Sequence, residues 1–225
     1  MKRSEINKLL REAAAFADKM NFRLPPFAYW SPEEWAEKGH EYDEIRDNML
    51  GWDITDFGKG DFDKIGLLLF TIRNGNLTDK KYGKPYAEKL LIVEVDQVTP
   101  YHFHWQKMED IINRGGGELV IKLYNSDEKE DFADTPVLVS SDGRNYEIPA
   151  GGIVRLTPGE SITLKQGQYH KFWAEKGKTL VGEVSKVNDD RVDNRFYEET
   201  GRFPEIEEDE KPLYLLGNEY PAAKD

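Results

Sequence analysis

The sequence predicts a mainly β domain, a sandwich or barrel of antiparallel strands, preceded by a helical segment. Apolar residues change from helical to alternating spacing after residue 51. Many short apolar runs then follow, separated by Gly, Pro, Asn and Asp. We expect one domain over residues 1–225. Residues 1–50 would form a helical extension, residues from about 60 to 187 the barrel, and residues 188–225 a tail packed on it.

The N-terminal extension opens with an apolar stripe at helical spacing. The stripe consists of Ile6, Leu9, Leu10, Ala13, Phe16, Ala17 and Met20. A capping box with proline at the first helical position, Ser31-Pro32-Glu33-Glu34, predicts a second, short helix. We expect Gly39 to end that helix.

Strand candidates fill the rest of the chain as far as residue 187. Residues 118–124 come close to strict alternation, as expected for a strand with one buried face. The three glycines at 115–117 predict a turn, and they lack the spacing and following helix of a phosphate-binding loop. The other candidates are residues 66–72, 89–95, 98–104, 137–140, 145–148, 153–156, 161–164, 169–174 and 180–187.

Charge and composition exclude several classes of partner and chemistry. The chain has 31 basic and 43 acidic residues, a net charge of -12, which disfavours nucleic acid and anionic membranes as partners. It has no cysteine, so disulfides and thiolate chemistry are excluded. Charged residues interrupt the N-terminal segment, and no apolar stretch reaches the ~18 residues of a membrane span. We therefore expect a cytoplasmic protein.

Three of the four histidines occur where they can share a site. His102 and His104 lie two residues apart on a predicted strand, so their imidazoles face the same side. Glu109 follows after a short connection, and His170 lies on another predicted strand. Three neutral imidazoles and a carboxylate suit Mn²⁺, Fe²⁺, Co²⁺, Ni²⁺ or Zn²⁺. Such a set would leave two positions open on a six-coordinate metal. His40 stands alone, and we expect no function for it.

The spacing of these residues resembles the cupin motifs. His102-x-His104-x4-Glu109-x6-Gly116 is similar to the first motif, and Gly167-x2-His170 to the core of the second. Lys165 and Ala174 stand where the second motif usually has proline and asparagine, which shape turns and not the ligand set. The resemblance implies a cupin β-barrel, an antiparallel jelly roll with the N-terminal helices packed outside.

Longer segments, spread over nearly the whole chain, resemble the cupin-type D-lyxose isomerases. The resemblance implies a manganese-dependent isomerase that interconverts D-lyxose and D-xylulose, often with D-mannose and D-fructose as a second pair, and a homodimer. The segments are Pro25-Pro26-Phe27-Ala28, Gly51-Trp52-Asp53-Ile54-Thr55-Asp56-Phe57-Gly58, Glu88-Lys89, Thr99-Pro100-Tyr101-His102-Phe103-His104-Trp105, Glu109-Asp110-Ile111-Ile112-Asn113-Arg114-Gly115-Gly116-Gly117 and Val187-Asn188-Asp189-Asp190.

The isomerase resemblance also implies groups that move protons. It places Lys89 in the sugar pocket, where the ammonium could donate to a sugar oxygen or move a proton. The base acting on carbon is expected to be a carboxylate with a raised pKa. Glu183, on an apolar strand, and Glu205, in a tail that could fold over the pocket mouth, are the two candidates.

Several further residues have two interpretations each. Asp189, Asp190, Asp193 and Arg195 follow the last long strand and either bind sugar hydroxyls or form a salt-bridge network in a loop. Trp105, next to a predicted ligand, either lines the pocket as a sugar-stacking wall or packs in the core.

Other activities use the same ligand set. A cupin dioxygenase would need redox-active iron, and a non-catalytic sugar-binding cupin would bind pentoses without turnover. A sugar-phosphate isomerase would need an anion pocket beside the metal, and no cluster of Arg or Lys near the ligands indicates one.

Overall fold

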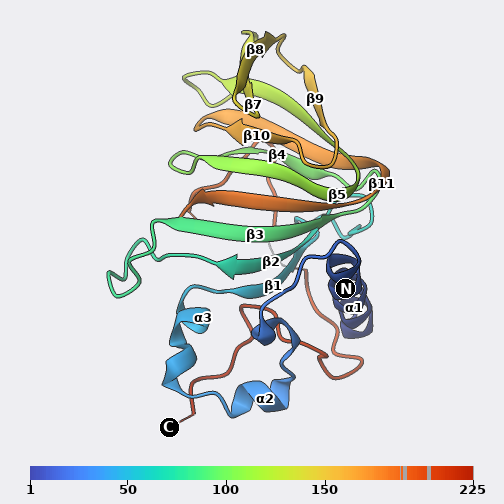
Figure 1. The fold of residues 1–225 in the computed structure, drawn as a ribbon, viewed down its shortest axis with the longest axis vertical. Coiled ribbons are helices and arrows are strands. Elements are labelled where there is room, and N and C mark those ends of the chain that lie inside the picture. Colours follow the sequence, from blue (N-terminus) through green and yellow to red (C-terminus); the bar gives the residue numbers. More distant parts are fainter. Residues whose placement is uncertain (188, 190–191, 202–203, 225) are drawn as a thin grey trace.

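The computed structural model describes residues 1–187, 189, 192–201 and 204–224. In that part of the chain twelve strands form one antiparallel sheet, with the main order β1-β2-β3-β11-β5-β10-β7-β8 (Figure 1). β4 pairs with β11 and β12, whereas β6 and β9 pair with β5. The strands are β1 (Gly51–Thr55), β2 (Leu67–Arg73), β3 (Tyr86–Val93), β4 (Thr99–Phe103), β5 (Glu109–Ser126), β6 (Phe132–Ala133), β7 (Val137–Ser141), β8 (Arg144–Ile148), β9 (Ile153–Leu156), β10 (Ser161–Leu164), β11 (Gln168–Lys186) and β12 (Arg195–Phe196).

The predicted N-terminal helices are present. They are α1 (Arg3–Lys19), η1 (Pro26–Tyr29), α2 (Pro32–Ala36), η2 (His40–Tyr42) and α3 (Asp43–Asp47). The capping box at Ser31 forms as predicted. α2 nevertheless ends before Gly39, because the N–H groups of Glu37 and Lys38 bond three residues back and close the last turn early.

β1, β2 and β3 are buried on both faces. Leu67 and Leu69 face the interior of the sheet, whereas Leu68 and Phe70 face the opposite way, in one apolar cluster with the buried stripe of α1. α1 lies beside this end of the sheet (Figure 1). A strand covered on both faces carries apolar residues at successive positions, which explains the run from Leu67 to Phe70 in β2.

The strand predictions need several corrections. The two-residue strands β6 and β12 were not predicted, and β12 lies beyond residue 187, where the barrel was expected to end. β1 was not predicted, so the sheet begins at residue 51 and not near residue 60. The two strands predicted over residues 169–174 and 180–187 form one strand, β11, which ends at Lys186 and whose register shifts between Glu175 and Thr179. The glycines at 115–117 lie inside β5 and do not form a turn. The β5–β11 register shifts beside them, where residues 176–178 of β11 stand opposite Gly117. Gly116 has a φ of +98°, and a Cβ there would lie 2.1 Å from the Lys178 carbonyl oxygen.

The C-terminal tail packs on α1 and β1. The buried guanidinium of Arg3 lies 2.6 Å from a carboxylate oxygen of Glu208 and 2.5 Å from one of Glu219. Leu216 is buried and bridges to Trp52. Within the described residues, no helix combines the length and the apolar character that crossing a membrane requires.

Candidate metal centre and active site

A cavity of about 380 Å³ opens inside the curved sheet. Strands β1, β2, β3, β4, β5 and β11 line it together with Asn194, Phe196, Thr200 and Gly201. One part of its wall is apolar and another part is polar. Leu67, Leu69 and Leu91 supply apolar surface, whereas β3, β4, β5 and β11 supply histidine, lysine and glutamate. The cavity therefore offers both a polar reaction centre and an apolar wall.

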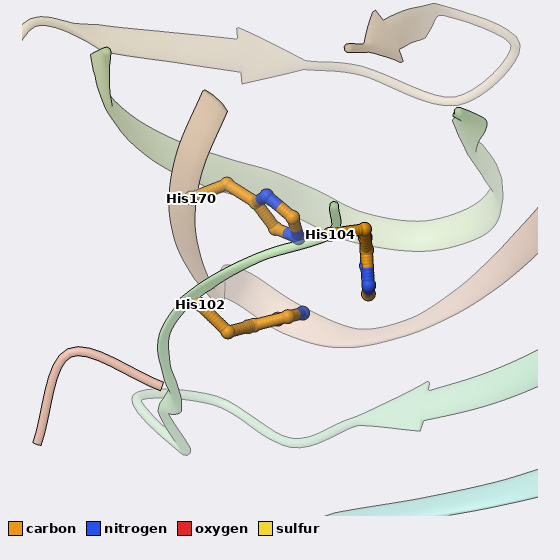
Figure 2. Close-up of side chains that lie close together, drawn as sticks. All are labelled: His102, His104 and His170. Atoms are coloured by element: carbon orange, nitrogen blue, oxygen red, sulfur yellow. The ribbon is translucent and has the colours of Figure 1, made fainter. Parts of the chain in front are cut away.

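Three histidines meet at the polar side of the cavity (Figure 2). One ring nitrogen of each of His102, His104 and His170 lies within 4.8 Å of the others. His102 comes from β4 and His104 follows the end of that strand, whereas His170 lies opposite His102 in the β4–β11 register. All three are at most 9 % exposed. The sequence spacing predicted the first pair, and strand pairing brings the third.

Backbone carbonyls orient all three rings. The Nδ1 atoms lie 2.9 Å from the Pro100 oxygen for His102, 2.8 Å from the Asp193 oxygen for His104, and 3.0 Å from the Gln168 oxygen for His170. A carbonyl only accepts, so each Nδ1 carries the proton and each Nε2 lone pair is left free. The buried Nε2 atoms of His104 and His170 find no hydrogen-bond partner among the described residues. Buried, unsatisfied lone pairs of this kind fit a metal ion.

Glu109 completes the predicted ligand set. Its Oε1 lies 3.3 Å from Nε2 of His104 and 3.2 Å from Nε2 of His170. Burial would raise the pKa of this carboxyl, but the Lys107 ammonium and His104 hold that pKa well below its usual value. Burial, with the two neighbouring imidazoles, lowers the pKa of His102 well below its ordinary value. An ionised carboxylate and neutral imidazole are the forms that bind a divalent metal.

A chain of buried charges continues from Glu109 into the cavity. The Lys107 ammonium lies 2.6 Å from Oε2 of Glu109 and 2.9 Å from Oε1 of Glu183. Lys89 lies 3.5 Å from the same Glu183 oxygen and faces it across the β3–β11 register. Lys107 was missed by sequence reasoning, because a lysine between Gln106 and Met108 resembles a solvated loop residue. Its one signal is its position two residues before Glu109.

The structure does not bring Trp105 or Glu205 to the cavity. Trp105 is 41 % exposed and donates its indole N–H to Glu130 on the outside of the sheet. It neither lines the cavity nor packs in the core, because it follows the end of β4 with its ring directed outward. Glu205 is exposed, and its backbone carbonyl accepts from the N-terminal amine of Met1. The tail at Glu205 is thus held beside the N-terminus, and Glu205 is not among the described residues that line the cavity.

Two described residues of the charged cluster after β11, Asp189 and Arg195, make contacts within the protein. The Asp189 carbonyl accepts from the N–H groups of Val192 and Asp193. Asp189 is not among the described residues that line the cavity. Asp190 lies outside the described residues. Arg195 forms an ion pair with Glu130 at 2.9 Å, which favours the salt-bridge interpretation for that residue.

β1 adds cavity residues that were not among the predicted site residues. Asp53 and Thr55 line the cavity, whereas Trp52 and Ile54 between them face the helix side. This alternation is present in the sequence. It could have predicted both the strand β1 and which of its residues face the interior of the sheet. Asn194 and Phe196 also line the cavity, from the tail segment that no strand pattern marked.

An antiparallel barrel with three interior histidines and a glutamate defines a cupin whose interior can hold a divalent metal. The structure of an L-ribose isomerase from Acinetobacter sp. DL28, solved with L-ribose, has the same fold, with a TM-score of 0.62 at 16 % identity over 92 % of this chain and 98 % of that one. The chain belongs to the D-lyxose isomerase family, whose model matches residues 1–220.

Two relatives match almost end to end. The chain is 49 % identical over 223 residues to a D-lyxose/D-mannose isomerase of Serratia proteamaculans, and the match covers 98 % of each protein. The identity and coverage are the same for a D-lyxose/D-mannose isomerase of Escherichia coli O157:H7. The family resemblance proposed from the sequence is therefore confirmed.

Proposed function

We propose that this protein is an aldose–ketose isomerase that interconverts D-lyxose and D-xylulose, and D-mannose and D-fructose, by proton transfer through an enediol. The observation that carries the proposal is the direct contact between the histidine–glutamate set and the buried chain Lys107–Glu183–Lys89. The activity named for the two relatives at 49 % identity supports the choice of sugars.

We propose Mn²⁺ as the native metal, with Co²⁺, Fe²⁺, Ni²⁺ and Zn²⁺ as competitors for the same ligands. His102, His104, Glu109 and His170 would hold it, and the unsatisfied Nε2 atoms of His104 and His170 support this assignment. When bound, the metal supplies Lewis acidity at the sugar oxygens O1 and O2.

Glu183 is the residue we assign as the base that moves the proton between C1 and C2. It lines the cavity and is 5 % exposed, and its carboxylate lies between two ammonium groups. Of the two carboxylates predicted for this role, Glu183 alone lines the cavity, because Glu205 is exposed beside α1. A buried carboxylate held in place is suited to take a proton and return it to the neighbouring carbon.

We assign Lys89 and Lys107 as hydrogen-bond donors to the sugar oxygens. Both line the cavity, and a lysine donor near O1 or O2 would stabilise negative charge as the enediolate forms. Thr99 also lines the cavity, and its buried Oγ1 has no hydrogen-bond partner among the described residues, so it is available to a sugar hydroxyl. Both lysines are already paired with carboxylates, which argues against a phosphate pocket and for a free sugar.

Assembly and location are also part of the proposal. A homodimer is expected from the family resemblance, and size-exclusion chromatography with light scattering would test it. A cytoplasmic location is supported by the absence of cysteine, because this fold needs no oxidising compartment. The net charge of -12 supports a small-molecule substrate and neither nucleic acid nor a membrane as partner.

A panel of free and phosphorylated sugars, assayed with the metal-stripped protein plus one divalent metal at a time, tests the function. Turnover of D-lyxose and D-mannose, highest with Mn²⁺, is the expected result. Oxygen uptake with iron would indicate a dioxygenase. Pentose binding without turnover would indicate a binding protein, and turnover confined to phosphorylated sugars would indicate a sugar-phosphate isomerase; each of these three results contradicts the proposal.

A further inference from the structure

The three histidines are oriented in two different ways. His102 and His170 use the carbonyl of the residue two positions earlier in their own strand or turn, Pro100 and Gln168. His104 instead uses the carbonyl of Asp193, which is 89 positions away along the chain. Two rings are therefore set by local backbone, and the third is set only if the C-terminal segment is in place.

The carboxylate of Asp193 makes a second contact, with the loop that follows His104. Its two oxygens accept the backbone N–H groups of Gln106 and Lys107, each at 2.8 Å. Asp193 is 5 % exposed, so these bonds are shielded from water. Asp193 thus holds the ring of His104 through its backbone carbonyl, and the backbone of Gln106 and Lys107 through its carboxylate.

The neighbours of Asp193 are docked along β4. β12 pairs with β4, which places Arg195 opposite Phe103 and Phe196 opposite His102. The N–H of Tyr197 donates to the carbonyl of Tyr101. This pairing accounts for the position of the segment, and the carboxylate of Asp193 adds direct hydrogen bonds to the loop that follows His104.

We infer that Asp193 is a positioning residue that makes metal affinity depend on the docking of residues 192–197. The inference rests on the proposed metal site. Groups that orient metal ligands through hydrogen bonds typically change metal affinity or activity by about 10- to 100-fold when they are removed. Asp193 does not line the cavity, so its effect on the sugar would be indirect.

The test uses Co²⁺ alone as the probe, added to the metal-stripped full-length protein. Its affinity is measured by competition with a chelator, and its coordination by visible absorption. Asp193→Ala keeps the backbone carbonyl that His104 uses and removes the two carboxylate bonds to the backbone of Gln106 and Lys107. The carbonyl is then no longer fixed against the loop that carries His104, so we expect Co²⁺ binding to weaken by about 10- to 100-fold and the absorption bands to change. Asp193→Asn keeps one acceptor oxygen, so a smaller loss is expected. Asp142→Asn is the matched control, because Asp142 also accepts backbone and hydroxyl hydrogen bonds from another segment, at Ser161, outside the cavity.

Melting of the metal-free proteins separates positioning from stability. A purely structural Asp193 would lower the melting temperature and leave the Co²⁺ affinity and spectrum of the folded protein as in wild type, and that result overturns the inference. If Asp193→Ala does not fold, the affinity and spectrum of Asp193→Asn decide in the same way. Failure of wild type to isomerise any sugar while binding Co²⁺ would refute the proposed function and leave this inference standing.

Discussion

The long strands and the C-terminal segment hold the site in different ways. β3, β5 and β11 present Lys89, Glu109 and Glu183 by register, with each strand paired over many residues. The segment around Asn194 and Phe196 is held by the two-residue strand β12 and a few hydrogen bonds. We expect the strand side to carry the chemistry, because its geometry is fixed, and the segment side to shape the cavity and adjust the ligands.

The largest effects are expected at the ligands on the strand side. Alanine at His102, His104, Glu109 or His170 should abolish stoichiometric metal binding and nearly all activity, because each leaves the set one donor short. Metal content measured after dialysis, alongside initial rates, checks this. His40→Ala is the control, since that ring is exposed and paired with Asp43. Full metal content and rate in His102→Ala or His170→Ala would refute the ligand assignment.

The next effect separates chemistry from metal binding. Glu183→Gln should lower kcat by about 10²-fold or more and leave the metal bound, because the amide cannot take a proton. Lys89→Ala should do the same through loss of a donor. Steady-state kinetics on metal-loaded variants give both values. A Glu183→Gln variant with wild-type kcat would show that the base lies elsewhere.

The contrast between the long strands and the C-terminal segment also helps to explain which site residues could be predicted from the sequence and which were missed. His102 and His104 were predictable because alternation on a strand is local. Lys107 and the pairing of Lys89 with Glu183 depend on which strands become neighbours, a property that no local pattern contains. The contributions of Asp193 and Phe196 come from a segment with almost no strand signal. The prediction that Trp105 lines the pocket or packs in the core was wrong. Its position next to His104 in the sequence does not determine the direction of a side chain that lies beyond the end of β4.

A smaller effect is expected on the segment side. Phe196 lines the cavity, with its ring centroid 5.3 Å from that of His102. Phe196→Ala should raise KM for D-lyxose by about tenfold, equivalent to about 1.4 kcal/mol, with a smaller change in kcat. Kinetics at saturating metal distinguish the two constants. A loss confined to kcat would show that Phe196 acts in the chemical step. It would contradict the expectation that the C-terminal segment only shapes the cavity and adjusts the ligands.

The smallest effect is expected outside the cavity. Trp105→Phe removes one exposed hydrogen bond to Glu130 and no cavity surface. KM for D-lyxose should therefore change by less than about twofold, since surface substitutions cost within about 0.5 kcal/mol. A large increase in KM, measured with the Mn²⁺-loaded protein, would return Trp105 to the sugar-binding surface.

Isomerisation of D-lyxose by the Mn²⁺-loaded protein in deuterated water tests the central claim most directly. If Glu183 moves a proton between C1 and C2 through an enediol, solvent deuterium should appear at C2 of lyxose and C1 of xylulose as turnover proceeds, and both turnover and exchange should fall together in Glu183→Gln. Turnover without any solvent deuterium at either carbon would contradict proton transfer by an exchangeable base, and no turnover of D-lyxose would contradict the proposed isomerase activity itself.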